Sequence, residues 1–149
     1  MLEVIQVASV LDVAKYILEK YGPLSVMKLQ KLIYYSQAWG LVWDNQPIFI
    51  EEVQAWASGP VNKELYEVLK GTFKVSHDII DDNSNVLTEN QKETIDAVCK
   101  FYIEKEPQEL SDMVRQESPW INARIGIADG ERSDRIISKE SMKEYYSNI

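Results

Sequence analysis

Few side chains in this sequence are suited to catalytic or metal chemistry. The 149 residues contain one cysteine, Cys99, and one histidine, His77. Together they supply too few soft ligands for a structural zinc site, and a single cysteine excludes an intramolecular disulfide. Cys99 falls among apolar positions at helical spacing, which favours a small buried hydrophobe over a nucleophile. No glycine-rich phosphate loop is present. The sequence therefore predicts no catalytic residue, no metal, no cofactor and a protein that is not an enzyme.

The polar residues best suited to recognition lie on one predicted helix, residues 25–43. This helix is apolar on most sides, which is typical of a helix at the centre of a bundle. Lys28, Lys31 and Tyr35 recur at i, i+3 and i+7 on one face. One interpretation is an exposed, partner-binding strip. The other is that the lysine stems cover apolar neighbours while the ammonium groups stay in water. The spacing leaves both interpretations open.

Arginine is confined to the last quarter of the chain. The four arginines are Arg115, Arg124, Arg132 and Arg135. Arginine binds carboxylates and phosphates bidentately and is enriched at protein interfaces. The alternative is pairing with neighbouring acids such as Glu117, Glu131 and Asp134. We predict Arg115 as a fourth partner-binding residue, close to Lys28 and Lys31 if its helix packs alongside the central one.

The elements that must position these residues follow from hydrophobic spacing and capping signals. Helices are predicted over residues 6–21, 25–43, 62–71, 88–103, 107–116, 118–125 and 138–146. Thr88 and Gln91 have capping-box spacing, and Asn62, Ser118 and Ser138 are predicted N-caps.

The predicted β-structure is small. Residues 48–50 and 53–56 are expected to form a short hairpin around Glu51-Glu52, followed by a sharp turn at Ser58 to Val61. Ile136-Ile137 is expected to be extended, and residues 81–85 to form a loop. The prediction is a mainly α (α+β) fold: a single compact helical domain, residues 1–149, with a central buried helix and a small β-hairpin.

The composition limits the classes of partner. The formal net charge is −8 and the sequence pI about 4.7, so the overall field opposes binding to nucleic acid. The first 17 residues lack a basic region before their apolar positions and are interrupted by Asp12 and Lys15, unlike a signal peptide. No run approaches the roughly 20 apolar residues that span a bilayer. We expect a cytoplasmic protein that contacts neither a membrane nor nucleic acid.

Several blocks, taken in order, resemble the Panacea domain family, which includes SocA-like antitoxins and GepA-type phage-associated proteins. The blocks are MKLQKLIYYSQAW, VQAW, SGPV followed by Leu65-Tyr66, Ser118-Pro119-Trp120 and the segment 137–146. Together they cover roughly residues 7–147. One departure stands out: the family commonly has Thr-His where this chain has Val114-Arg115. Either Arg115 is used differently here, or the contribution of that histidine is lost.

The resemblance implies a mostly helical, non-enzymatic, protein-binding antitoxin-like module. Family members neutralise co-encoded toxins by direct binding, so a cognate toxin is the implied partner and a phage or prophage the implied source. The alternatives are an adaptor that delivers a bound partner to an AAA+ protease, and a phage protein that binds a host factor.

The resemblance also separates the implied site residues into two groups. The implied structural residues are Trp39, Trp56, Gly59, Pro60, Val61, Tyr66, Pro119 and Trp120. The residues expected to be exposed for partner binding are Lys28, Lys31, Tyr35 and Arg115.

Overall fold

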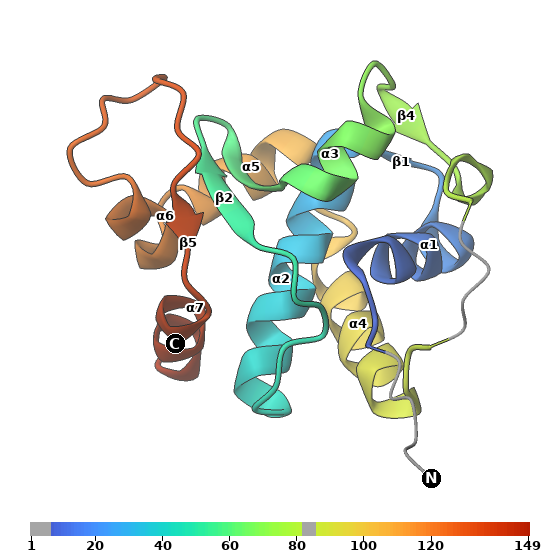
Figure 1. Ribbon diagram of the computed structural model, residues 1–149. Coiled ribbons are helices and arrows are strands. Elements are labelled where there is room, and N and C mark those ends of the chain that lie inside the picture. Colours follow the sequence, from blue (N-terminus) through green and yellow to red (C-terminus); the bar gives the residue numbers. More distant parts are fainter. Residues whose placement is uncertain (1–6, 82–85) are drawn as a thin grey trace, which may run out of the picture.

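The computed structural model describes residues 7–81 and 86–149, and helix α2 lies at its centre (Figure 1). α2 runs from Val26 to Trp43, after the N-cap Ser25, whose hydroxyl accepts the backbone N–H of Lys28 at 3.1 Å. Every residue from Leu29 to Ala38 is buried. The predicted central buried helix is therefore confirmed.

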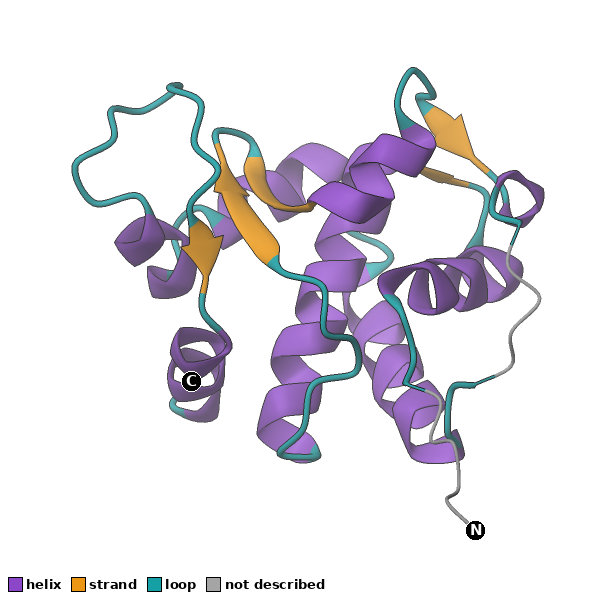
Figure 2. Ribbon diagram, in the orientation of Figure 1, coloured by secondary structure: helices purple, strands orange, loops and turns teal. Residues whose placement is uncertain are grey.

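The other helices surround α2 and make the fold mainly helical. α4 and α7 flank α2, and α1 and α5 also pack against it (Figures 1 and 2). Their bounds are α1 Val10–Tyr21, α3 Lys63–Leu69, α4 Glu89–Tyr102, α5 Pro107–Val114, α6 Ser118–Ala123 and α7 Lys139–Ser147, with a 3₁₀ turn η1 at His77–Ile79. None of the helices in the described ranges is long and apolar enough to cross a membrane.

Local capping signals fix most helix starts. The Thr88–Gln91 capping box is present, and Asn62 and Ser138 cap α3 and α7 as predicted. The N-cap of α6 is Glu117, one residue before the predicted Ser118.

Some predicted bounds also change. α1 begins at Val10 because Ser9 forms a capping box with Asp12, and the predicted start at Gln6 lies outside the described residues. α3 ends at Leu69 before the predicted Gly71. Of the predicted loop 81–85, only Asp81 is described.

A three-stranded antiparallel sheet contains the hairpin, with strand order β3-β2-β5. β2 (Val53–Trp56) pairs with β3 (Gly59–Asn62) and with β5 (Ile136–Ile137). The predicted pairing of residues 48–50 with 53–56 is wrong. The predicted turn at residues 58–61 is also displaced, since the two-residue loop is Ala57-Ser58 and Gly59 opens β3 with φ +128°.

A side chain of α2 explains why residues 48–50 form no strand. The Gln37 Oε1 accepts the backbone N–H of Ile48 at 2.8 Å, and its Nε2 donates to the Phe49 carbonyl at 2.7 Å. The backbone groups of this segment are thus satisfied by a helix side chain.

A second sheet has two strands, β1 (Leu24–Ser25) and β4 (Lys74–Val75), paired antiparallel. It joins the start of α2 to the segment after α3. The carbonyl of Phe73 accepts the backbone N–H of Val26 at 2.9 Å, which extends this contact into the first turn of α2.

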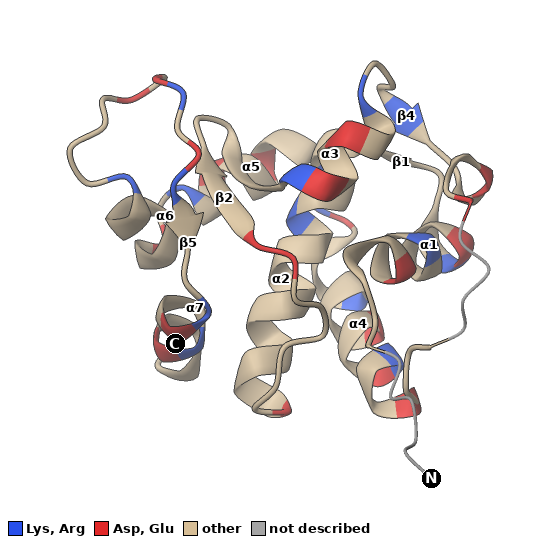
Figure 3. Cartoon of the chain, viewed as in Figure 1, with Lys and Arg blue, Asp and Glu red and all other residues tan. Residues whose placement is uncertain are grey.

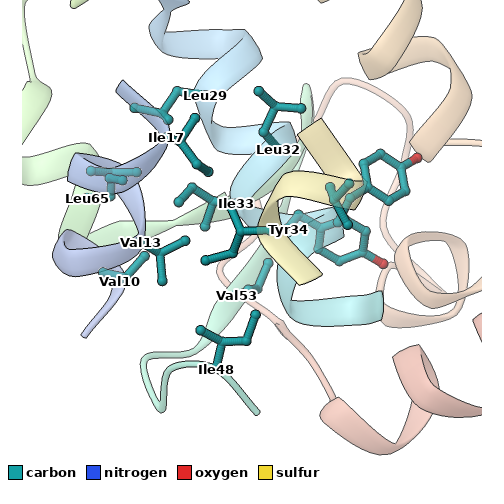
Figure 4. Close-up of a cluster of buried hydrophobic side chains, with 14 of the residues drawn as sticks. Val10, Val13, Ile17, Leu29, Leu32, Ile33, Tyr34, Ile48, Val53 and Leu65 are labelled. Carbon is teal, nitrogen blue, oxygen red and sulfur yellow. The ribbon is translucent and has the colours of Figure 1, made fainter. Parts of the chain in front are cut away.

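The main core forms where α1, α2, α3 and the hairpin meet. Figure 4 shows Val13 and Ile17 of α1 facing Leu29 and Ile33 of α2, with Leu65 of α3 beside them. Each of these side chains is at most 1% exposed. Burying one such side chain contributes about 1.5–3 kcal/mol, so this cluster fixes the position of the central helix.

Candidate functional site

Lys28 lies on the first turn of α2 and is half-buried. Its Nζ donates a hydrogen bond to the carbonyl of Ile103, the C-cap residue of α4. A lysine ammonium group is favourable at a helix C-terminus, where backbone carbonyls lack helical partners. Lys28 therefore connects α2 to the end of α4.

Lys31, one turn later, is 1% exposed. Its Nζ lies 3.4 Å from the carbonyl oxygen of Pro60, beneath the β2–β3 hairpin. Burial, together with the positive charge of Arg115, lowers the pKa of Lys31 from the ordinary 10.5 to about 8. The expectation that Lys31 is exposed is wrong, because the hairpin covers this face of α2.

Gly59 permits this close approach. A Cβ atom at Gly59 would lie 2.8 Å from Cε of Lys31 and 3.3 Å from Cγ1 of Val114. Its φ of +128° is also a conformation that residues with a Cβ rarely adopt. The hairpin can lie directly on the Lys31 stem only with glycine at this position.

Tyr35 is also completely buried, so its predicted exposure is wrong. Its ring stacks on Tyr102 of α4, with centroids 4.2 Å apart. Its hydroxyl donates to Oε1 of Glu117 at 2.7 Å. Tyr35, which was predicted to bind a partner, thus connects α2 to α4 and to the start of α6.

Glu117 is the centre of a buried polar cluster. Its Oε1 accepts hydrogen bonds from Tyr35 and from Tyr146 of α7, each at 2.7 Å. The Tyr146 hydroxyl also lies 3.1 Å from that of Tyr34. Burial raises the pKa of Glu117, while the two tyrosine hydrogen bonds oppose the rise. This cluster connects three helices, α2, α6 and α7, at one carboxylate.

Arg115 is the C-cap residue of α5, and its side chain is 35% exposed. Its Nη2 lies 2.7 Å from Oδ1 of Asp112, and its Nε donates to the carbonyl of Ser111. α5 packs alongside α2 as the prediction required, and the charge of Arg115 reaches Lys31. Arg115 and Lys28 thus keep partly exposed side chains, whereas Lys31 and Tyr35 are buried.

Among the described residues, none of the other arginines forms the suggested ion pairs with Glu117, Glu131 or Asp134. Arg124 is buried and donates to the carbonyls of Ala55, Ala128 and Glu131. Arg135 donates to the carbonyl of Ile125. Arg124 also lies over the ring of Trp120, 5.1 Å from its centroid.

The residues implied to be structural connect the hairpin to the helices. Trp120 donates its indole N–H to the carbonyl of Trp56 at 2.8 Å, and Trp56 packs edge-on against Tyr66. Trp39 donates to the hydroxyl of Tyr102 at 3.1 Å. Gly59, Pro60, Val61 and Pro119 are all buried.

Two positioning residues gave only a weak sequence signal. Gln30 and Gln37 share a face of an otherwise apolar helix. Gln30 accepts the backbone N–H of Asn62 at 2.9 Å and donates to the Asn62 carbonyl at 3.0 Å, just as Gln37 holds residues 48 and 49. The signal in the sequence is a glutamine on a helix predicted to be buried, because a buried side-chain amide must find hydrogen-bond partners.

Cys99 is a buried free thiol. Burial raises its pKa to about 12, so at neutral pH it is protonated and weakly nucleophilic. His77 lies exposed on η1. Across residues 7–81 and 86–149, no group of three or more His, Cys, Asp or Glu side chains is arranged to hold a metal ion.

Comparison with known proteins gives one match. The profile of the family described as "Antitoxin SocA-like, Panacea domain" matches residues 29–121, which run from α2 into α6. The matched segment covers more than half of the chain, so the chain belongs to this family. No curated protein and no solved structure gives a significant match.

Proposed function

We propose that this chain is an antitoxin that neutralises a cognate protein toxin by forming a direct complex with it. The supporting observation is the family match over residues 29–121. That segment includes most of α2, the hairpin, α5 and the start of α6. The proposal places the protein in the cytoplasm, with a phage or prophage as the source of its gene.

Arg115 is our candidate for direct contact with the toxin. Its charged side chain is 35% exposed and forms an ion pair with Asp112, which is itself exposed. Lys31 and Tyr35 are buried, so we propose that they act indirectly. Lys31 supports the hairpin, and Tyr35 holds Glu117, two residues from Arg115. Lys28 contributes in the same way through the end of α4.

Co-expression with the protein encoded by the neighbouring gene tests the proposal. We expect growth rescue and co-purification in a fixed stoichiometry. A neighbour that is not toxic, or that neither co-purifies with this chain nor loses its toxicity on co-expression, would count against it.

A purified AAA+ protease reaction separates neutralisation from adaptor activity, because an adaptor would shorten the half-life of the bound partner. A complex with a host protein in place of the neighbour would indicate the host-factor alternative.

A substitution pair tests the contact residue. Arg115→Ala should weaken the complex at least fivefold. Arg132→Ala removes the same charge from an exposed position and should change affinity less than twofold. Equal effects would mean that only net charge matters, and Arg115 would not be a contact residue.

A further inference from the structure

A groove between α6 and α7 has walls suited to a cation. Its volume is about 350 Å³, within the range of small binding pockets. It is lined by Ser118 and Asn122 of α6, by Ser141, Glu144 and Tyr145 of α7, and by Asn148 and Ile149, which follow α7. α6 and α7 lie side by side (Figure 1), so the groove is set by the packing of two helices.

The groove presents negative charge. Of the described residues that line it, Glu144 is the charged one. The two lysines of α7 interact elsewhere: Lys139 lies 3.5 Å from a carboxylate oxygen of Glu52, and Lys143 donates to Asn45. Figure 3 shows α7 carrying both signs of charge, but these contacts hold its lysines toward the segment between α2 and β2.

Glu117 adds a second negative charge behind the groove wall. It is the N-cap residue of α6, directly before Ser118. Burial raises the pKa of Tyr145, and the nearby charge of Glu117 raises it further, so the field of this carboxylate reaches the side chain that lines the groove.

Polar groups in the groove are available for a ligand. Among the described residues, the side chains of Asn122 and Glu144 make no hydrogen bond or ion pair, and both are exposed. Tyr145 is half-buried and supplies an aromatic wall. A carboxylate, an amide oxygen and a ring face together suit a guanidinium group, which has five planar donors and stacks on aromatic rings.

We propose that this groove receives an arginine side chain from an extended segment of the protein partner. The inference rests on the proposed function and adds the chemistry of the partner. Charge complementarity supports the choice, because the groove is acidic and the whole chain carries −8. α7 lies outside the family match at residues 29–121, so this contact would use a surface completed by the C-terminal helix.

The test uses the full ¹⁵N-labelled chain and the capped tripeptide acetyl-Gly-Arg-Gly-amide. We expect saturable shifts of backbone amides around residues 118–122 and 141–148. The isosteric citrulline peptide, which lacks the charge, should bind at least fivefold more weakly. Glu144→Gln should also weaken binding of the arginine peptide at least fivefold. The variant should fold normally, because the Glu144 side chain is exposed and forms no hydrogen bond or ion pair with another residue that the structure describes.

Glu93→Gln is the matched control. Glu93 is exposed on α4, so its substitution changes net charge equally and should alter affinity less than twofold. Shifts spread over the surface without saturation, equal binding of citrulline, or equal weakening by Glu93→Gln would overturn the proposal. Growth rescue by the unmodified chain is measured separately. Loss of peptide binding with intact rescue refutes the groove alone, and peptide binding without rescue refutes antitoxin function alone.

Discussion

Lys31 places an ammonium group in a buried position beneath the hairpin. In the described part of the chain its Nζ has one hydrogen-bond acceptor, the Pro60 carbonyl at 3.4 Å, and no carboxylate within ion-pair distance. Lysine is seldom fully buried without a partner. Its ammonium group therefore costs stability at neutral pH, and its lowered pKa is the thermodynamic sign of that cost.

Replacing Lys31 with methionine should make the protein more stable at pH 7, by about 1–3 kcal/mol, because the stem is preserved and the buried charge removed. The pH dependence has a defined sign. Between about 8 and 10.5, the folded and ordinary pKa values, the unfolded chain binds more protons. The free energy of unfolding of the wild type should therefore rise by up to about 1.4 kcal/mol per pH unit relative to Lys31→Met.

Urea unfolding of both proteins at pH 7 and 9.5 measures this difference, and the variant should lose its advantage at the higher pH. If the free energies of unfolding of the two proteins changed equally between these pH values, Lys31 would keep its ordinary pKa in the folded protein.

Tyr146→Phe should destabilise the protein by about 1–3 kcal/mol, because it removes the hydrogen bonds to Glu117 and Tyr34. One of the two donors that lower the pKa of Glu117 is lost, so that pKa should rise further. Carboxyl ¹³C titration measures the pKa of Glu117, and urea unfolding measures the change in stability.

Tyr145→Phe is the control, since no hydrogen bond involves the Tyr145 hydroxyl within the described residues. It should change stability by less than about 0.5 kcal/mol. Similar losses in both variants would argue against the cluster.

The sequence could place Lys28, Lys31 and Tyr35 on one helix face but could not predict what covers it. The face is covered by the hairpin at Gly59-Pro60 and by the junction at Glu117, which come from distant parts of the chain. Helical spacing defines which residues share a side. Burial of that side depends on long-range packing that spacing does not contain.

At the level of elements, locally encoded features were predictable and non-local ones were not. The caps at Asn62, Thr88 and Ser138 need only neighbouring residues, and all three were predicted. The strand partner of residues 53–56 was predicted wrongly. Apolar patterning made residues 48–50 look like a strand, while the deciding hydrogen bonds come from Gln37 in another element.

Gly59→Ala should destabilise the hairpin by about 2–4 kcal/mol, combining backbone strain with a clash against Lys31 and Val114. Gly71→Ala separates the two causes, because Gly71 also has positive φ, +85°, but no atom lies within 4 Å of its added Cβ. It should cost about 1 kcal/mol. Thermal unfolding of both variants measures the difference, and equal losses would show that the contact with Lys31 adds nothing to strain.

At the scale of the whole molecule, the core extends beyond the family match. α1 buries Val13 and Ile17 and α7 buries Met142 and Tyr146, and these side chains belong to the same cluster as those of α2. Both helices lie outside residues 29–121. The matched region thus depends on flanking helices for part of its packing.

A fragment of residues 29–121 should therefore fail to unfold cooperatively, since it would expose the faces of α2 that α1 and α7 cover. Far- and near-ultraviolet circular dichroism with thermal melting of the fragment and the full chain makes the comparison. A sharp melt of the fragment close to that of the full chain would refute this dependence.

The burial of Lys31 also makes its amine a chemical probe of how often the hairpin opens. The chain has twelve lysines, and every other lysine that the structure describes reaches solvent at least partly. An amine-acylating reagent should thus modify those lysines quickly and Lys31 only when the hairpin lifts from α2. The rate at which mass spectrometry detects acylated Lys31 would measure how often the hairpin opens. A partner that binds over the hairpin should slow that rate.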